Sequence, residues 1–180
     1  MSTSESAVNG NISKCQLAYI DKIKQQIADS SSAIPLCYNP DNYAPRGVPK
    51  LEETFWLKPV YVMDPEKQFV GLKIKCSKCD KHFASDGWSP NYRHVHCLNT
   101  SAYLLQKKMK CKCQKSNTTV YELLQFDSVP DYLKLFYPFA DTPKSMIHDE
   151  ITTLLMTDCV TAKTFYEIGQ TIASFRLQQC

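Results

Sequence analysis

With 180 residues, 43% of them hydrophobic, the chain can form one ordinary domain with a buried core, and its apolar runs are too short to cross a bilayer. Its first residues lack the basic flank and apolar stretch of a secretory signal, so we expect an intracellular location. In such a reducing compartment, nine cysteines do not indicate a disulfide framework. The net charge is only +3, but residues 70–119 carry nine lysines and one arginine against two aspartates, a local charge of +8.

The first third of the chain is predicted to contain one helix between two irregular segments. Residues 1–12 are rich in Ser and Asn and are expected to be disordered. In residues 13–29, Ser13 and Gln16 have the spacing of a capping box and apolar residues recur at helical intervals. This pattern predicts an amphipathic helix that docks on the core or binds a partner protein. Four prolines and no steady hydrophobic period indicate a linker over residues 30–54.

Residues 55–126 are predicted to form a β region. Leu72, Ile74 and Cys76 alternate with lysines, which is typical of a half-buried strand. The segments "YRHVHCL" and "SAYLLQKKMKC" indicate a β-hairpin with its turn at "NTS". The segment "VYELLQF" that closes this region is also strand-like.

Residues 127–176 are predicted to be helical and to pack on the β region. Three helices are expected, with Ser128, Thr142 and Thr161 as their N-terminal caps. The last two could form a helix-turn-helix that reads DNA. Because the outward face of the last helix has little positive charge, two packed core helices are the favoured interpretation.

Four cysteines in the basic segment have the spacing of a metal site. Cys76 and Cys79 form a Cys-x-x-Cys pair, and Cys111 and Cys113 form a Cys-x-Cys pair after 31 intervening residues. The intervening residues can hold a hairpin and a loop that return the second pair to the first. Four thiolates suit one tetrahedral structural Zn²⁺, and neighbouring lysines would favour the thiolate form.

Other interpretations of these side chains remain open. One of four residues between the pairs could replace a ligand: His82, His94, His96 or Cys97. The histidines of "RHVH" fall on one face of a predicted strand, and an exposed basic face is the favoured explanation for them. Some of the four cysteines could instead be buried apolar thiols. Four further cysteines have no close partner in the sequence: Cys15, Cys37, Cys159 and Cys180.

A series of short motifs follows a fixed order from Phe55 to Phe175. The motifs are "WLKP" at 56–59, Pro65, Gly71, the first cysteine pair, "GW" at 87–88, "R-x-V" at 93–95, "YLL" at 103–105, the second cysteine pair, "VP" at 129–130 and "FYP" at 136–138. In this order the chain resembles a zinc-ribbon-like domain family of unknown function, found in transposon-derived and exonuclease-associated fungal and animal proteins. The second pair departs from the family, in which it is Cys-x-x-Cys. The resemblance implies a zinc-stabilised module that is accessory to nucleic-acid transactions.

The expected fold is therefore α+β, with a zinc-ribbon-like antiparallel β part followed by a small C-terminal helical part. The expected function is a structural-zinc-binding accessory module that binds or targets DNA in a transposable-element-derived protein, and a DNA-binding role would place it in the nucleus. Phosphate attraction would come from eight residues: Lys73, Lys75, Lys78, Arg93, Lys107, Lys108, Lys110 and Lys112. Stacking on bases would come from Trp88, Tyr92 and Tyr103.

Two other classes of function are weighed against this one. The alternative is a protein-interaction or scaffolding module without nucleic-acid contact, using the helix at 14–28 or the aromatic-rich segment "DYLKLFYPF". An enzyme is not expected, because the chain has no paired-carboxylate or phosphate-loop signature. It also lacks a His-x-Glu upstream of a Pro-Cys-x-x-Cys, as a zinc deaminase would need.

Overall fold

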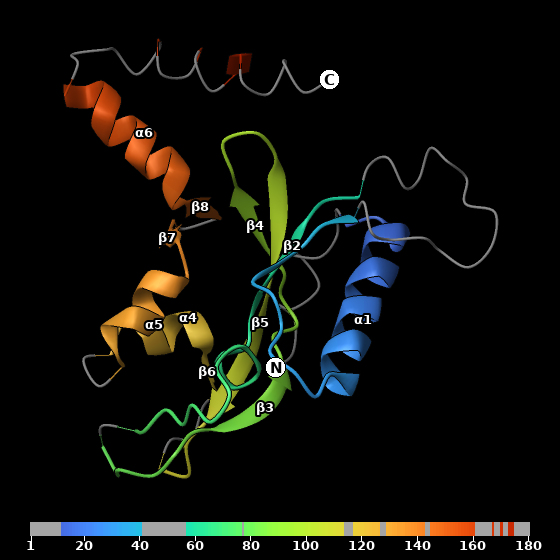
Figure 1. Cartoon of the computed structure of the whole chain (residues 1–180), viewed down its shortest axis with the longest axis vertical. Coiled ribbons are helices and arrows are strands. Elements are labelled where there is room, and N and C mark those ends of the chain that lie inside the picture. The colour runs from blue at the N-terminus through green and yellow to red at the C-terminus, as the bar shows by residue number, and fades with distance from the viewer. Residues whose placement is uncertain are drawn as a thin grey trace, which may run out of the picture.

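The computed structural model describes residues 12–40, 57–76, 78–113, 117–126, 129–142 and 145–160, and four single residues beyond them, at 167, 170, 173 and 174. These residues form an α+β fold, as expected, built on one curled sheet (Figure 1). The helices are α1 (Lys14–Asp29), α3 (Pro65–Gln68), α4 (Val120–Leu124), α5 (Asp131–Phe136) and α6 (Asp149–Val160). The strands are β1 (Cys37–Tyr38), β2 (Val60–Met63), β3 (Ala84–Trp88), β4 (Arg93–His96), β5 (Ser101–Lys110), β6 (Thr118–Thr119), β7 (Phe139–Asp141) and β8 (Met146–His148).

Strand β5 is the centre of the sheet. Its first half lies between β2 and β4, and its second half pairs with β3 and β6. The main path through the sheet is β1-β2-β5-β4-β8-β7. The expectation of a purely antiparallel β part is wrong, because β2 pairs with β5, and β4 with β8, in parallel.

The predicted hairpin is confirmed as β4 and β5. Its register pairs Arg93 with Leu104 and His96 with Ser101. The N–H of Cys97 donates to the carbonyl of Thr100 across the turn, at 3.0 Å. Local alternation and a polar turn were therefore sufficient signals for this element.

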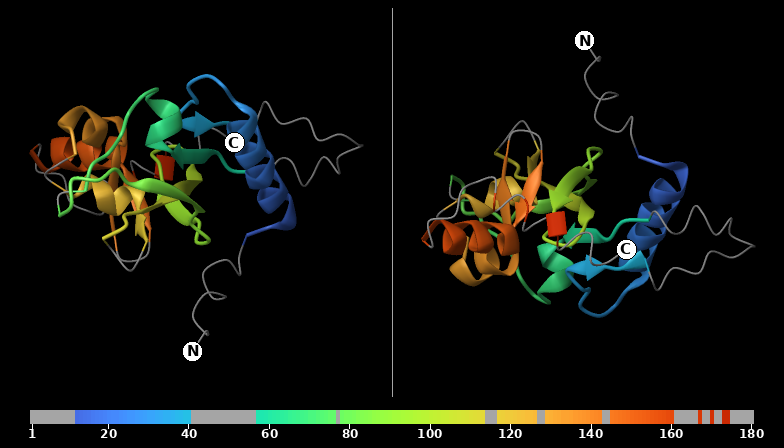
Figure 2. Two further views of the ribbon diagram at one scale, coloured as in Figure 1. Left: turned by 90° about the horizontal axis from the view of Figure 1, so that it is seen from below. Right: turned by 90° about the horizontal axis from the view of Figure 1, so that it is seen from above.

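Two hydrophobic clusters lie on opposite faces of the sheet, so the molecule has helices on both sides (Figure 2). Helix α1 covers one face with Tyr19, Ile20, Ile23 and Ile27, which pack with side chains of β2 and β5. Helices α4 and α5 contribute buried leucines and a valine to the other cluster, which also contains the buried residues around the cysteines. Alternation along β2 and β5 supplies both clusters, because successive side chains of a strand point to opposite faces.

The predicted helix near the N-terminus is confirmed, with a difference at its start. The Ser13 hydroxyl accepts a hydrogen bond from the N–H of Gln16, as a cap should. The Gln16 side chain does not return to Ser13 but is buried against the chain before β2. Its amide donates to the carbonyl of Lys58 at 3.1 Å and accepts from the Lys58 N–H at 2.8 Å. The helix is thus attached to the sheet by a pair of hydrogen bonds as well as by its apolar face.

Two segments that were predicted to be strands differ in the structure. Residues 72–76 keep the expected burial alternation but form only an isolated bridge, between Lys75 and His82. The segment "VYELLQF" begins as helix α4. Its start is fixed by a capping box in which the Thr119 hydroxyl accepts from the Glu122 N–H, while the Glu122 carboxylate accepts from the Thr119 N–H. The cap outweighs the strand-like composition.

The region expected to be helical after residue 127 contains a small hairpin. Helix α5 ends before Pro138, as predicted, but Thr142 does not begin the next helix. Its hydroxyl instead accepts from the N–H of Ser145 at 3.1 Å, within the turn that joins β7 to β8. Helix α6 begins at Asp149, six residues after the first helical position that a cap at Thr142 predicts.

Two predictions lie almost wholly outside the described residues: the disordered tail over 1–12, of which only Ile12 is described, and the cap at Ser128. Of the helix predicted after Thr161, the structure describes only residues 167, 170, 173 and 174, and each of these is helical. Within the segment expected to be a linker, Cys37 and Tyr38 form β1 at the edge of the sheet. No helix among the described residues has the length and apolar character needed to cross a membrane.

Candidate metal centre

The first cysteine pair lies on a tight turn between residues 74 and 83, in the green segment at the lower end of Figure 1. The turn is closed by three backbone hydrogen bonds. Phe83 N–H donates to the Ile74 carbonyl, Cys76 N–H to the Lys81 carbonyl, and Asp80 N–H to the Cys76 carbonyl, each at 2.9 Å. Asp80, directly after Cys79, has a positive φ of 54°, a conformation that Asp tolerates better than most residues.

The second pair directly follows β5, and the register of the sheet brings it to the first. Strand β3 begins just after the turn, and its first residue, Ala84, lies opposite Lys110 at the end of β5. The turn that carries Cys76 and the chain that carries Cys111 therefore meet at one end of the β3–β5 pair. The spacing argument, in which a hairpin and a loop return the second pair to the first, describes this path correctly.

The four sulfur atoms form one compact group. The Sγ–Sγ distances are 3.5 Å for Cys76 and Cys113, 3.3 Å for Cys79 and Cys111, and 3.4 Å for Cys111 and Cys113. All four Sγ atoms lie within 4.8 Å of one another. A regular tetrahedron with metal–sulfur bonds near 2.3 Å has edges of about 3.8 Å, whereas a disulfide bond is about 2.05 Å long. The four thiols are free and are spaced to hold one metal ion.

The group consists of cysteines alone among the described residues, without a histidine or carboxylate. Cys76 and Cys111 are buried, Cys79 is half-buried and Cys113 is exposed. The alternative ligands have other surroundings. The His94 ring packs on Tyr103 with centroids 4.6 Å apart, and Cys97 Sγ lies 3.9 Å from Tyr61 Oη in the core.

The electrostatics of the group favour a bound cation. The backbone N–H of Lys78 is the main cause that lowers the pKa of the Cys76 thiol to about 7. The pKa of Cys113 is raised to about 12, first by its hydrogen bond with Cys111 and then by the other two thiols. One thiolate therefore suppresses ionisation of the next, and the four sulfurs need a positive ion at their centre to ionise together.

The predicted nucleic-acid-binding residues fall into two groups. Five of them are exposed around the cysteines: Lys73, Lys75, Lys78, Lys110 and Lys112. Lys108 is half-buried. Lys107 has only 19% of its side chain exposed, lies 4.0 Å from the centroid of the Trp88 ring and is 3.8 Å from the Asp64 carboxylate.

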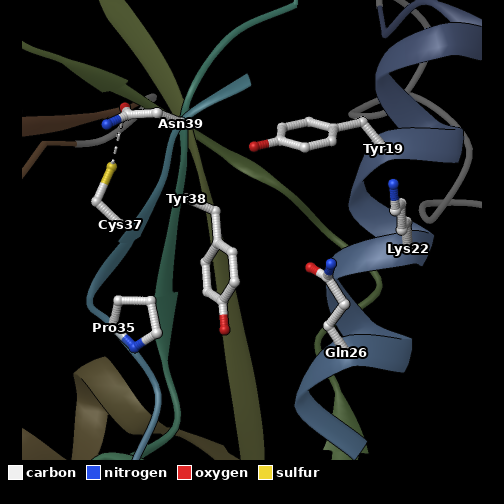
Figure 3. A pocket seen from close by; sticks show the side chains of 7 residues that line it. All are labelled: Tyr19, Lys22, Gln26, Pro35, Cys37, Tyr38 and Asn39. Carbon is white, nitrogen blue, oxygen red and sulfur yellow. Dashed lines mark hydrogen bonds between the residues drawn. The ribbon is translucent and has the colours of Figure 1, made fainter. Parts of the chain in front are cut away.

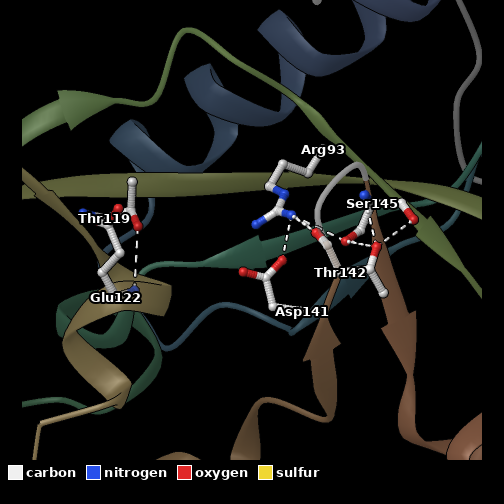
Figure 4. Close-up of polar contacts among 6 residues, drawn as sticks. All are labelled: Arg93, Thr119, Glu122, Asp141, Thr142 and Ser145. Carbon is white, nitrogen blue, oxygen red and sulfur yellow. Dashed lines mark hydrogen bonds and ion pairs between the residues drawn. The ribbon is translucent and has the colours of Figure 1, made fainter.

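Arg93 is half-buried and its guanidinium is engaged within the fold. Its guanidinium donates to the carbonyl of Thr142 at 2.8 Å and to the carbonyl of Ser145 at 3.1 Å, and it forms an ion pair with Asp141 (Figure 4). These contacts attach the β7–β8 turn to β4. This role could not be predicted from local sequence patterns, because the turn lies about 50 residues from Arg93.

The aromatic residues expected to stack on bases are largely enclosed. Tyr92 and Tyr103 are 9% and 4% exposed and belong to the cluster under α1. Trp88 is half-buried, with Lys107 over its ring. The two tyrosines are therefore not available to a nucleic acid.

A pocket of about 340 Å³ between α1 and β1 was not foreseen from the sequence (Figure 3). It is lined by Tyr19, Lys22, Gln26, Pro35, Cys37, Tyr38 and Asn39. The Cys37 thiol donates to the Asn39 side chain at 3.8 Å, and burial raises its pKa to about 11. Cys37 is thus a neutral thiol at physiological pH, and the pocket holds no group of metal ligands.

No protein-family model, curated protein or solved structure matches this chain.

Proposed function

We propose that the chain is a zinc-binding module whose metal has a structural role and whose basic surface attaches it to nucleic acid, most readily DNA. The observation that carries the proposal is the group of four cysteine sulfurs within 4.8 Å of one another. We also propose that the chain comes from a transposable-element-derived protein that acts in the nucleus. This part of the proposal depends only on the order of short motifs between Phe55 and Phe175.

Zinc is the metal that this donor set favours. Four thiolates select Zn²⁺ or iron–sulfur centres over oxygen-seeking cations such as Mg²⁺ and Ca²⁺. With Cys76, Cys79, Cys111 and Cys113 as ligands, no coordination position is left for a substrate, so a structural role is favoured over a catalytic one. The ion would join the 74–83 turn to the chain that follows β5, beside the pairing of Ala84 with Lys110.

The first test is the zinc stoichiometry of protein purified under reducing conditions, measured by native mass spectrometry. We expect one zinc per chain, lost on chelation and lost in Cys76→Ser and Cys111→Ser. Cys97→Ser is the matched control, because Cys97 is equally buried but lies outside the group. A protein without zinc, or full zinc retention in both ligand variants, would overturn the metal assignment.

The second test addresses nucleic-acid attachment by the zinc-loaded protein. Binding to a fluorescein-labelled 20-base-pair DNA duplex is followed by fluorescence anisotropy at 50 mM salt. We expect saturable binding that weakens steeply with salt, because phosphate contacts release counterions. Absence of binding to DNA and RNA duplexes alike at this ionic strength would refute this part of the proposal.

A protein-interaction role is the second candidate, and exposed apolar side chains favour it. Val70 is 84% exposed, and Tyr132 and Leu135 of α5 are 53% and 82% exposed. Of the two roles predicted for the apolar face of α1, docking on the core or binding a partner, the structure shows the first, because this face is packed on the sheet. Under this candidate, binding to a partner protein would be lost in Leu135→Glu and would be insensitive to the lysines around the cysteines.

A further inference from the structure

Resting on the proposed function, we infer that the exposed lysines around the metal centre contact the phosphate backbone of a nucleic-acid duplex and do not read its bases. We call these residues the lysine tip: Lys73, Lys75, Lys78, Lys81, Lys110 and Lys112, all exposed. The inference names the part of the molecule that binds and the chemical feature that it recognises.

The alternation of side chains creates the lysine tip. In the first segment Ile74 and Cys76 are 5% and 2% exposed, while Lys73 and Lys75 on either side of Ile74 face solvent. In the second segment Met109 and Cys111 are buried, and the lysines that follow each of them are exposed. The period that turns the sulfurs inward therefore turns the ammonium groups outward on both segments.

The charge of the tip remains positive after its neighbours are counted. Asp80 forms an exposed ion pair with Lys75, at 3.3 Å, and Asp86 accepts a hydrogen bond from Asn117. A zinc centre with four thiolates would carry a formal charge of −2. The positive charge of the six ammonium groups is larger than the combined negative charge of the two aspartates and the zinc centre. Two of the four cysteines, Cys76 and Cys111, are also buried. Such a surface attracts polyanions regardless of their sequence.

The described side chains that were predicted to stack on bases, and Arg93, are buried or engaged within the fold. Single-strand binding depends on exposed aromatic platforms, but Tyr92 and Tyr103 are buried and the Trp88 ring is covered by Lys107. The commonest base contact is a bidentate arginine, and Arg93 is engaged by Asp141 and the β7–β8 turn. Lysine at the tip supplies point charges for phosphates.

The test compares two double variants of equal charge change. Lys110→Gln/Lys112→Gln alters the tip, whereas Lys14→Gln/Lys22→Gln alters two exposed lysines of α1. With six phosphate contacts, log K should fall with log salt with a slope of about −5, so affinity drops about a thousand-fold from 50 to 200 mM salt. The tip variant should make that slope less steep by about 2, from about −5 to about −3, and the α1 variant should leave the slope unchanged.

Five probes define the recognised feature: two DNA duplexes of equal length and different sequence, a single DNA strand of that length, an RNA duplex, and vesicles of phosphatidylserine and phosphatidylcholine. We expect affinities for the two DNA sequences within about threefold, and weaker binding to a single strand of the same length. Either duplex type as the tighter ligand supports the inference. Tenfold discrimination between sequences, preference for the single strand or for vesicles, or equal effects of the two double variants would overturn it.

The outcomes separate this inference from the proposed function. A protein without zinc refutes the metal assignment, and a zinc-loaded protein that binds no probe refutes nucleic-acid attachment and this inference together. A zinc-loaded protein that binds duplex equally well in the tip and α1 variants refutes only the inference. Zinc is measured in each variant preparation, so that a loss of affinity is not confused with a loss of metal.

Discussion

Replacing Arg93 should destabilise the protein without weakening its attachment to nucleic acid. The guanidinium of Arg93 donates to two backbone carbonyls, at 2.8 and 3.1 Å, and pairs with the Asp141 carboxylate. Hydrogen bonds that involve a charged group contribute about 1.5–3 kcal/mol each when buried. The side chains of Arg93 and Asp141 are 25% and 44% exposed, so the ion pair itself contributes about 0–1 kcal/mol. We expect Arg93→Gln to lower the free energy of unfolding by about 2–4 kcal/mol.

The assay is thermal and urea unfolding of Arg93→Gln beside Lys78→Gln, which removes the same charge from an exposed position. A change of this size corresponds to a lower Tm by about 5–15 °C for a chain of this length. Lys78→Gln should melt within about 2 °C of the parent. If Arg93→Gln keeps the parent's stability but loses affinity for a DNA duplex, the guanidinium contacts nucleic acid and the structural role assigned to it is wrong.

Variants at three further positions probe other parts of the fold by urea unfolding. Gln16→Ala leaves the Lys58 N–H and carbonyl without partners under α1 and should cost about 2–4 kcal/mol; parental stability would show that α1 does not depend on this pair. Thr119→Ala removes the cap of α4 and should cost about 1 kcal/mol, whereas Thr119→Ser should restore most of it. Burial raises the pKa of the Asp64 carboxyl above 3.8, so the native protein binds a proton there more readily than the unfolded chain does. The contribution of Asp64 to stability is therefore present at low pH and is lost as pH rises from about 3.8 through the raised native pKa. Asp64→Asn should therefore gain stability relative to the parent as pH rises from about 4 to 7, and a difference that is independent of pH would contradict this assignment.

The features predicted correctly depend on neighbours in the sequence. The helix at Lys14–Asp29 has a cap and a periodic apolar face, and the β4–β5 hairpin has alternation and a polar turn. The meeting of the cysteine pairs followed from their spacing and from that hairpin, although the strand that pairs with the end of β5 beside the cysteines is β3 and not β4. Local physical chemistry determines these elements, so the sequence expresses them directly.

The features that were missed depend on contacts between distant residues. Thr142 and the proline after it have the pattern of a helix start, but Arg93 holds the β7–β8 turn from another strand. Tyr103 and Met109 are six residues apart on β5, a spacing that places two side chains on one face of a regular strand. They nevertheless belong to different hydrophobic clusters, and β5 changes its partner strands between them. Helix α4 is an exception, since Thr119 and Glu122 carried a readable capping box that the strand-like composition obscured.

The division of β5 into two halves has a consequence for local unfolding of the protein. The amides of its first half lie between β2 and β4 beneath two hydrophobic clusters, whereas those near Lys110 depend on the short pairings with β3 and β6 beside the cysteines. Amide exchange should therefore become faster along this one strand, from Leu104 toward Lys110. Without metal the far half should exchange through fraying that leaves the near half protected, so that a single strand reports both the integrity of the core and the occupancy of the cysteine group.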